Sequence, residues 1–273
     1  DLVAANASSD DVSVLRGNGD GTFQAADDHP VGDRPSSIAS GDLDGDGVPD
    51  LVTADADGDA LSVLRGVGDG TFDAPVSIPV GDRPVHVALG DLDGDGVQDI
   101  VAANGRSDDV SLLLSRTGGV YDAVRLPVGG SQLTFVVPAD LDADGLPDLV
   151  VASRWFPIVL WGSGQGEFEA AEQIPSGIVQ ADVRAVAVDD IDGDRVPDLV
   201  VLDGSGVVSL LRGNGDRTFA DPIRVATGQA PWALVVTDVD RDHVPDLVTA
   251  NDGFIDGITV LINQRDALVD VDV

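Results

Sequence analysis

Short apolar runs of four to six residues recur along the whole chain, and Gly, Asp or Pro stands at the ends of each run. The runs are rich in Val, Leu and Ile, as at positions 51–54, 100–103, 149–152 and 199–202. Branched apolar runs of this length between turn-forming residues are typical of β-strands, and no stretch has helical periodicity. The hydrophobic pattern therefore predicts an all-β fold.

The runs form a unit that repeats at intervals of 48 to 50 residues. In each unit a first apolar run leads into an acidic loop, a second leaves that loop, and a third follows a short polar turn. A weaker fourth run follows a Gly-rich turn that ends in an aromatic residue, as in the segment 17–23. Four short antiparallel strands in a repeat of this length are typical of a β-propeller blade. We therefore predict a β-propeller of four-stranded blades.

The acidic loop is a nonapeptide of the form Asp-x-Asp-x-Asp-x-x-x-Asp, followed by Leu or Ile and then Val, and it occurs five times. Carboxylates on alternate residues of a tight turn converge on one point. Hard oxygen ligands in that number suit Ca²⁺ better than Zn²⁺ or copper. The loops therefore predict five Ca²⁺ sites, and we expect the ions to stabilise the fold rather than to take part in chemistry.

Loop positions 1, 3, 5 and 9 are expected to give a side-chain carboxylate, and position 7 a backbone carbonyl. The predicted metal ligands are Asp42, Asp44, Asp46, Val48, Asp50, Asp91, Asp93, Asp95, Val97, Asp99, Asp140, Asp142, Asp144, Leu146, Asp148, Asp190, Asp192, Asp194, Val196, Asp198, Asp238, Asp240, Asp242, Val244 and Asp246. Position 6 needs a positive φ, which Gly47, Gly96 and Gly145 adopt without strain. Arg195 and His243 stand there in the fourth and fifth loops, so we expect those two sites to be strained or weaker.

The motifs that carry these sites resemble the FG-GAP or VCBS-type repeat of integrin α-subunit propellers, of many secreted bacterial proteins and of a fungal integrin-like lectin. The resemblance rests on Asp-x-Asp-Gly-Asp-Gly-x-x-Asp-Leu-Val together with Gly-Asn-Gly-Asp-Gly-Thr-Phe, and it covers nearly the whole chain. It implies a β-propeller with Ca²⁺ between the first and second strands of each blade. It identifies no ligand, because such repeats occur in adhesins, lectins and enzyme-associated domains alike.

The number of blades follows less directly from the repeats. The second and third strand patterns occur six times, whereas the acidic loop occurs five times. We expect six blades in a single domain over residues 1–273, with a seven-bladed ring truncated at its N-terminus as the alternative. The strand-like segment 267–273 is expected to complete either the first or the last blade. The chain opens on Asp1-Leu2-Val3, which matches the end of a loop motif, and this indicates a processed product or a fragment of a longer protein.

The charge of the chain limits the partners that it can bind. The formal net charge is −34, and 49 acidic residues face 15 basic ones. Such a field repels phosphate backbones and anionic lipid surfaces, which argues against nucleic acid and membrane partners. No apolar run is long enough for a transmembrane helix. Loops that use Ca²⁺ to this extent indicate an extracellular or cell-surface location, where the ion is abundant.

One turn in the fourth repeat departs from the others, and it suggests where a ligand binds. Arg154, Trp155 and Phe156 stand where other repeats carry Asp, Ser and Gly. In a four-stranded blade this turn and the loops between blades lie on the face opposite the Ca²⁺ loops. Aromatic faces beside Arg suit sugar rings or acidic peptide side chains. The candidate ligand-binding residues are Arg154, Trp155, Phe156, Trp232, Arg83 and His86. The alternative is that Trp155 and Trp232 plug the central channel or pack between blades.

Catalysis finds little support in the sequence. The paired carboxylates are accounted for by Ca²⁺, cysteine is absent, and the three histidines fall at different repeat positions. We therefore expect no enzyme. Two functional classes stay open: a secreted or cell-surface binding module, adhesive or lectin-like, with a glycan or protein ligand, and a non-catalytic structural domain of a larger extracellular protein or filament.

Overall fold

The computed structural model describes residues 1–116, 120–177, 182–252, 257–264 and 268–271. These residues form β-strands and turns, and none of them forms a helix that could cross a membrane. The all-β prediction is therefore confirmed. The chain divides into two compact units, which are described separately: residues 1–136 with 164–167, and residues 137–163 with 168–273.

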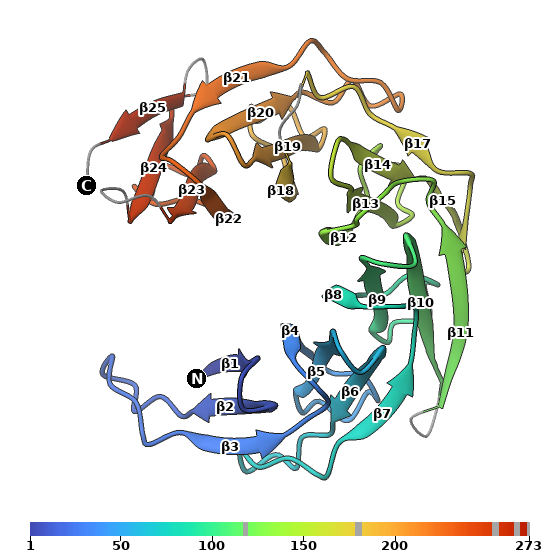
Figure 1. Ribbon diagram of the computed structural model, residues 1–273. Helices are drawn as coiled ribbons and strands as arrows, with labels where there is room; N and C mark the ends of the chain where they lie inside the picture. The colour runs from blue at the N-terminus through green and yellow to red at the C-terminus, as the bar shows by residue number, and fades with distance from the viewer. Residues whose placement is uncertain (117–119, 178–181, 253–256, 265–267, 272–273) are drawn as a thin grey trace. The chain divides into compact units, whose positions relative to one another are not determined.

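The first unit contains one three-stranded and two four-stranded antiparallel sheets in sequence order (Figure 1). Their strands are β1 (Leu2–Asn6), β2 (Asp11–Leu15) and β3 (Asp27–Pro30); β4 (Pro35–Gly41), β5 (Asp50–Asp55), β6 (Ala60–Leu64) and β7 (Val76–Pro79); and β8 (Pro84–Gly90), β9 (Asp99–Asn104), β10 (Asp109–Arg116) and β11 (Val120–Pro127). Each strand pairs with its neighbours in the sequence, as expected for blades.

The second unit repeats this arrangement in three four-stranded sheets. Their strands are β12 (Phe135–Ala139), β13 (Asp148–Ala152), β14 (Pro157–Leu160) and β17 (Glu172–Gln173); β18 (Val183–Asp189), β19 (Asp198–Asp203), β20 (Val207–Leu211) and β21 (Ile223–Ala226); and β22 (Pro231–Thr237), β23 (Asp246–Asn251), β24 (Ile258–Asn263) and β25 (Leu268–Val271). A small hairpin of β15 (Gly162–Gly164) and β16 (Glu167–Phe168) lies between β14 and β17 in the sequence.

The two middle strands of the four-stranded sheets hold most of the core. Every residue of β5 and β6 is buried, whereas β7 is largely exposed. In the first unit Val52, Leu61, Ile100 and Leu113 are among the residues of one apolar cluster that joins neighbouring sheets. This burial explains why the runs after each acidic loop are continuously apolar rather than alternating, since both faces of these strands are covered.

The C-terminal segment completes the last sheet. Strand β25 pairs with β24 from Val260↔Val271 to Asn263↔Leu268. Of the predicted segment 267–273, residues 267, 272 and 273 lie outside the described residues. The first sheet consists of β1, β2 and β3 and has no strand preceding β1.

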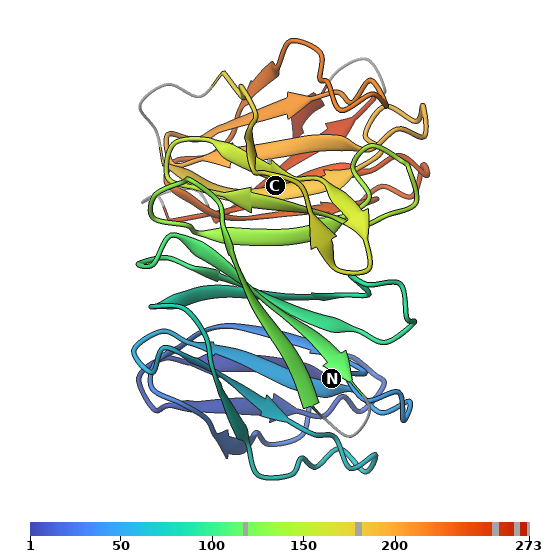
Figure 2. The same cartoon turned by 90° about the vertical axis from the view of Figure 1, so that its right-hand side faces the viewer.

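In four sheets the first strand contains a β-bulge. The register of the first strand against the second shifts between Pro35 and Ser37, Pro84 and His86, Val183 and Ala185, and Pro231 and Ala233. The extra residue is Ser36, Val85, Arg184 or Trp232, and each lies six positions before the first Asp of its acidic loop. Bulges of this kind turn a side chain out of the regular alternation of a strand. Figure 2 shows turns at both ends of the strands. The bulge lies near the start of each of these four first strands and the acidic loop follows the end of the strand, so the two lie at opposite ends of it.

Candidate metal-binding loops and a Trp–Arg cluster

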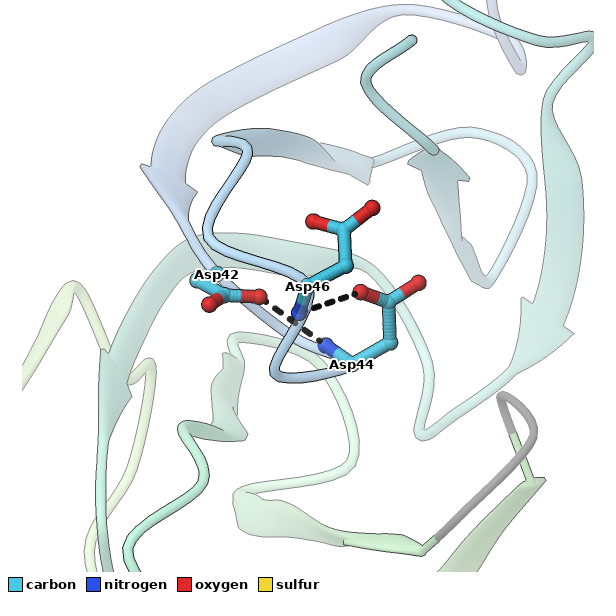
Figure 3. A group of neighbouring side chains, drawn as sticks. All are labelled: Asp42, Asp44 and Asp46. Carbon is cyan, nitrogen blue, oxygen red and sulfur yellow. Dashed lines mark hydrogen bonds between the residues drawn. The ribbon is translucent and has the colours of Figure 1, made fainter. Parts of the chain in front are cut away.

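We number the acidic loops Asp loops 1 to 5, at residues 42–50, 91–99, 140–148, 190–198 and 238–246. Each connects the first and second strands of its sheet. In Asp loop 1 the carboxylate of Asp42 accepts hydrogen bonds from the backbone N–H groups of Gly45 (2.8 Å) and Gly47 (2.9 Å). Asp44 accepts one from Asp46 N–H, and both residues lie close to Asp42 in Figure 3. The loop thus wraps its own backbone around the carboxylate at position 1.

Three carboxylates in each loop bring one oxygen to within 4.8 Å of one another. These groups are Asp42, Asp44 and Asp46; Asp91, Asp93 and Asp99; Asp140, Asp142 and Asp148; Asp190, Asp192 and Asp194; and Asp238, Asp240 and Asp246. Of the predicted carboxylate ligands, Asp50, Asp95, Asp144, Asp198 and Asp242 are not part of these groups. Positions 1 and 3 therefore converge in all five loops, joined by position 5 or position 9.

The Asp at position 9 has a second, structural task. Asp50 is buried, and its two oxygens accept hydrogen bonds from Leu43 N–H (3.1 Å) and Gly66 N–H (2.8 Å). The first bond closes the loop, and the second holds the residue beyond the third strand. The same pair of bonds, at 2.7 to 3.0 Å, occurs at Asp99, Asp148, Asp198 and Asp246. The Asp at position 9 thus joins the loop to the third strand by hydrogen bonds, whether or not it also binds an ion.

The electrostatics of the loops favour a bound cation. Burial raises the pKa of Asp148 and of Asp198 to about 6, against the backbone hydrogen bonds that lower it. The neighbouring loop carboxylates raise both pKa values further. A cation among the converging oxygens would relieve this repulsion. The donor set consists of hard carboxylate oxygens, which fits Ca²⁺. The backbone carbonyls of Val48, Val97, Leu146, Val196 and Val244 stay predicted ligands.

Asp loops 4 and 5 adopt the same conformation as the others in spite of their larger side chains. Arg195 has a φ of 73°, and Arg241 and His243 have a φ of 67° each. Their backbone N–H groups make the same bonds to the first Asp of the loop, as Arg195 N–H does to Asp190 at 2.9 Å. Side chains in this left-handed region are strained relative to glycine. The expected strain is therefore present, while weaker binding stays a prediction.

A guanidinium contacts the position-3 carboxylate in four loops of the described structure. Arg116 Nη1 lies 2.6 Å from Asp93, and Arg217 Nε lies 2.7 Å from Asp142. The corresponding distances are 3.5 Å from Arg65 to Asp44 and 3.4 Å from Arg212 to Asp192. Within the described residues, Asp loop 5 has only His243, at 4.0 Å from Asp238. Burial and the carboxylates of Asp242, Asp246 and Asp238 raise the pKa of Asp240, the position-3 residue of that loop.

At the other end of the strands, the second unit carries a cluster of two exposed tryptophans and two arginines. The guanidinium of Arg154 lies 4.8 Å from the Trp155 ring, and that of Arg184 lies 4.5 Å from the Trp232 ring. Asp182 joins the two pairs, at 2.8 Å from Arg154 and 3.9 Å from Arg184. Trp155 is 45% exposed and Trp232 is 59% exposed. We call these five residues the Trp–Arg cluster.

The position of the Trp–Arg cluster follows from the strands that carry it. Arg154 and Trp155 lie in the turn from β13 to β14, at the end of β13 opposite Asp loop 3. Arg184 and Trp232 are the bulge residues of β18 and β22. Both tryptophans are exposed, and the Trp232 ring lies against Arg184 of the preceding sheet. Ligand binding and packing between blades therefore both stay predictions for these two residues. Trp161, by contrast, is buried and donates its indole N–H to Glu172 at 2.9 Å.

The other predicted ligand-binding residues take no part in the contacts just described for the Trp–Arg cluster. Phe156 is half-buried, and its carbonyl oxygen accepts hydrogen bonds from Ser153. Arg83 and His86 belong to the first unit. His86 stacks on Phe135 with ring centroids 3.6 Å apart, and burial lowers its pKa to about 4. His86 is therefore a neutral packing group at physiological pH.

The sequence interpretation missed Asp182 and Arg184. A signal for Arg184 exists, because it lies six residues before Asp190, as Trp232 lies six residues before Asp238. This shared spacing places Arg184 and Trp232 at equivalent bulges of β18 and β22. Asp182 has no such signal, since nothing in its immediate sequence distinguishes it from the many other Asp residues of the chain.

These sheets and loops define a repeat protein of the β-propeller class. Residues 1–53, 42–102, 91–151, 140–201 and 190–249 each match the FG-GAP-like repeat model, so the chain belongs to the FG-GAP-like repeat family. The predicted resemblance is confirmed. No curated protein sequence is similar enough to count as a match.

Solved structures with the same fold have diverse descriptions. An Agrocybe aegerita lectin that recognises non-reducing terminal N-acetylglucosamine is 18% identical, with a TM-score of 0.65 over 99% of this chain and 78% of that one. BBS1N in complex with ARL6DN is 16% identical, with a TM-score of 0.68 over 99% and 77%. A Bacteroides uniformis protein described as a candidate 6-phosphogluconolactonase is 16% identical, with a TM-score of 0.76 over 98% and 79%. At these identities the similarity shows the fold alone.

Proposed function

We propose that this chain is a calcium-stabilised binding module of a secreted or cell-surface protein, and that the Trp–Arg cluster binds a saccharide. The observation that carries this proposal is the pair of exposed tryptophans, each with a guanidinium on its ring and both joined through Asp182. Exposed aromatic rings that gather beside charged groups, unlike single exposed apolar residues, are typical of binding surfaces.

The chemistry of the cluster favours a sugar. An exposed indole face offers an apolar surface for the C–H groups of a pyranose ring. Beside it, a guanidinium can donate hydrogen bonds to the sugar hydroxyl groups, and a carboxylate can accept hydrogen bonds from them. Arg154 and Asp182 hold each other at 2.8 Å, which fixes both groups before a ligand arrives. The Agrocybe aegerita lectin supports saccharide recognition by this fold in general, and its 18% identity carries the comparison no further.

Calcium has a supporting role in this proposal. In the sheets that carry the cluster, each Asp loop lies at the opposite end of the strands from the cluster residues, so we assign the ions to stability rather than to ligand contact. A dissociation constant near 10⁻⁴ to 10⁻³ M would fill the loops outside a cell but not in the cytosol. Calcium titration by calorimetry tests this support for the proposed location, because sites of nanomolar affinity would fill in the cytosol as well and would no longer point outside the cell.

A glycan array followed by calorimetry on the bound saccharide tests the ligand. Trp155→Ala and Trp232→Ala should each weaken binding at least about thirtyfold, as for a buried aromatic contact in an interface. The matched control is Phe23→Ala, which removes an aromatic residue that is 42% exposed in the first unit and should leave binding unchanged.

The second candidate is a non-catalytic structural domain of a larger extracellular protein. The repeat family and the five Asp loops are equally compatible with this role. It predicts that no saccharide binds and that Trp155→Ala changes only the melting temperature. A protein ligand with an acidic side chain is the remaining outcome, and it would appear as binding to acidic peptides that Arg154→Gln and Arg184→Gln abolish.

A further inference from the structure

The contacts between arginines and Asp loops share one geometry. In each of Asp loops 1 to 4 the guanidinium contacts Oδ2 of the position-3 carboxylate, at 2.6 to 3.5 Å. In three of these loops the same arginine also reaches a second carboxylate of the loop: Asp50 from Arg65, Asp95 from Arg116 and Asp144 from Arg217. In each of these four loops the arginine thus contacts one carboxylate, at position 3, that belongs to the converging group.

Further contacts hold three of these arginines in place. Arg65 donates to the Tyr121 hydroxyl at 2.9 Å, and Arg116 pairs with Asp122 at 2.9 Å. Arg217 pairs with Glu169 at 2.9 Å and lies 5.2 Å from the ring of Trp161. A guanidinium with several fixed partners loses less entropy in each contact than a free surface side chain does. These pairs therefore differ from ordinary exposed ion pairs.

The arginines reach the loops from two different places in the repeat. Arg65 and Arg212 directly follow the third strand of the sheet that carries their loop, and Arg116 ends that strand. In the sheet of Asp loop 3 the corresponding residue is Trp161, which has no charge. There Arg217 approaches instead from the turn between β20 and β21, and it covers the Trp161 ring. Asp loop 3 therefore also has a guanidinium beside its position-3 carboxylate, although the arginine comes from a different turn.

A guanidinium and a calcium ion compete for the same carboxylates. The guanidinium lowers the mutual repulsion of the carboxylates in the metal-free loop, and it repels an incoming divalent cation a few ångströms away. Both effects act in the same direction on binding. They stabilise the empty loop and weaken the filled one.

We propose that Arg65, Arg116, Arg212 and Arg217 are built-in counter-cations that keep Asp loops 1 to 4 closed when calcium is scarce and raise the calcium concentration at which each loop fills. This inference rests on the calcium part of the proposed function. It adds that the sensitivity of the molecule to calcium is set by arginines outside the loop motif.

Arg217→Gln is the sharpest test, because Arg217 lies outside the strands and its loss leaves Asp loop 3 intact. Calcium binding is followed by native mass spectrometry over a series of free calcium concentrations, and melting temperature is measured with chelator and with calcium. The matched control is Arg125→Gln, which removes an arginine that pairs with Asp109 away from every Asp loop.

In Arg217→Gln we expect one ion to bind at a roughly tenfold lower calcium concentration than in the parent chain. The melting temperature in chelator should fall by several degrees, so that calcium raises it by more than in the parent. Adding Asp142→Asn should remove the shifted ion and so assign it to Asp loop 3. Arg125→Gln should leave the calcium concentrations unchanged.

Two results would overturn the inference. If the shifted ion binds more weakly in Arg217→Gln, then the arginine orients Asp142 for the metal instead of replacing it. If neither affinity nor stability in chelator changes, then the contact is incidental. A parent chain that binds no calcium at all would overturn the calcium role as well, and this outcome is seen in the first titration, before any variant is made.

Discussion

The same β-bulge carries different side chains in the two units. In the first unit the bulge residues are Ser36, whose hydroxyl donates to Ala54 O at 3.0 Å, and Val85. In the second unit they are Arg184 and Trp232, which lie against each other with Trp232 exposed. The backbone feature is shared, so it belongs to the fold, whereas the side chains that it presents differ from unit to unit. A binding surface on a repeat protein is to be sought where the conformation repeats and the chemistry does not.

The Asp loops behave in the opposite way. All five share the hydrogen bonds at positions 1 and 9, even where Arg195 and His243 replace glycine. Such uniformity is expected of a structural element with the same task in each of the five four-stranded sheets that carry it. The two ends of the strands therefore differ in kind, and the following predictions test that difference.

The largest effect is expected from calcium. With free Ca²⁺ at about a hundred times the dissociation constant, each site adds about 2.7 kcal/mol to stability by linkage. Several such sites should raise the melting temperature by at least about 10 °C relative to chelator. Mg²⁺ should restore much less, because it requires a smaller octahedral site. Differential scanning calorimetry measures this shift. Equal melting curves with and without chelator would mean that the Asp loops do not stabilise the fold by binding calcium.

Loss of the two hydrogen bonds that the Asp at position 9 accepts should lower stability even without calcium. Asp148→Ala leaves the N–H groups of Leu141 and Gly162 buried without their acceptor, at roughly 1–3 kcal/mol each. Urea unfolding in chelator should show a loss of about 3 kcal/mol. Asp144→Ala in the same loop is the control, because its carboxylate is half-exposed, and we expect it to cost under 1 kcal/mol in chelator. Equal losses would mean that the two hydrogen bonds of Asp148 contribute no more to stability than the half-exposed carboxylate of Asp144 does.

Exchanging the bulge residues tests the comparison between the units directly. Trp232→Ser gives the second unit the side chain of Ser36 and should weaken saccharide binding by about 2 kcal/mol, while the bulge itself persists. Val85→Ser makes the corresponding change in the first unit and should leave binding unchanged. Calorimetric affinities of both variants decide the matter. If Val85→Ser weakens binding as much as Trp232→Ser, then the first unit also contributes to the site.

Acid should destabilise the first unit through His86. Burial lowers its pKa to about 4 in the folded chain, so the unfolded chain binds more protons between pH 4 and 6.5 and stability falls as the pH drops through that range. The expected loss between pH 7 and pH 5 is about 2 kcal/mol. In His86→Gln this part of the loss should disappear, whereas the contribution of the carboxylates stays. Urea unfolding of both proteins at the two pH values measures the difference, and parallel losses would show that His86 titrates normally.

The sequence predicted the parts of this molecule that depend on local patterns. Continuous apolar runs mark the buried middle strands, and the spacing of Asp marks the loops, because both patterns act within a few residues. The bulge at Arg184 was not predicted, since a one-residue shift in register leaves no trace in hydrophobicity. The contact between Arg217 and Asp142 joins residues 75 positions apart and depends on how neighbouring sheets pack. The repeats reveal the sites that the sheets share, whereas the sites that differ between sheets depend on contacts that only the three-dimensional structure shows.

The smallest effect concerns the strained positions of Asp loops 4 and 5. Arg195 has a φ of 73°, where a side chain costs about 1 kcal/mol relative to glycine. Arg195→Gly should therefore stabilise the chain by roughly 0.5–1 kcal/mol, since the unfolded-state entropy of glycine offsets part of the gain. The reverse change, Gly96→Ala at a φ of 87°, should destabilise Asp loop 2 by a similar amount. The stability of Arg195→Gly is to be measured both in calcium and in chelator. If the gain in stability is equal in the two conditions, then the strain at Arg195 is present in the empty loop as well as in the filled one. A gain confined to calcium would mean that the empty loop relaxes, and that Asp loop 4 binds its ion more weakly than Asp loop 2 for this reason.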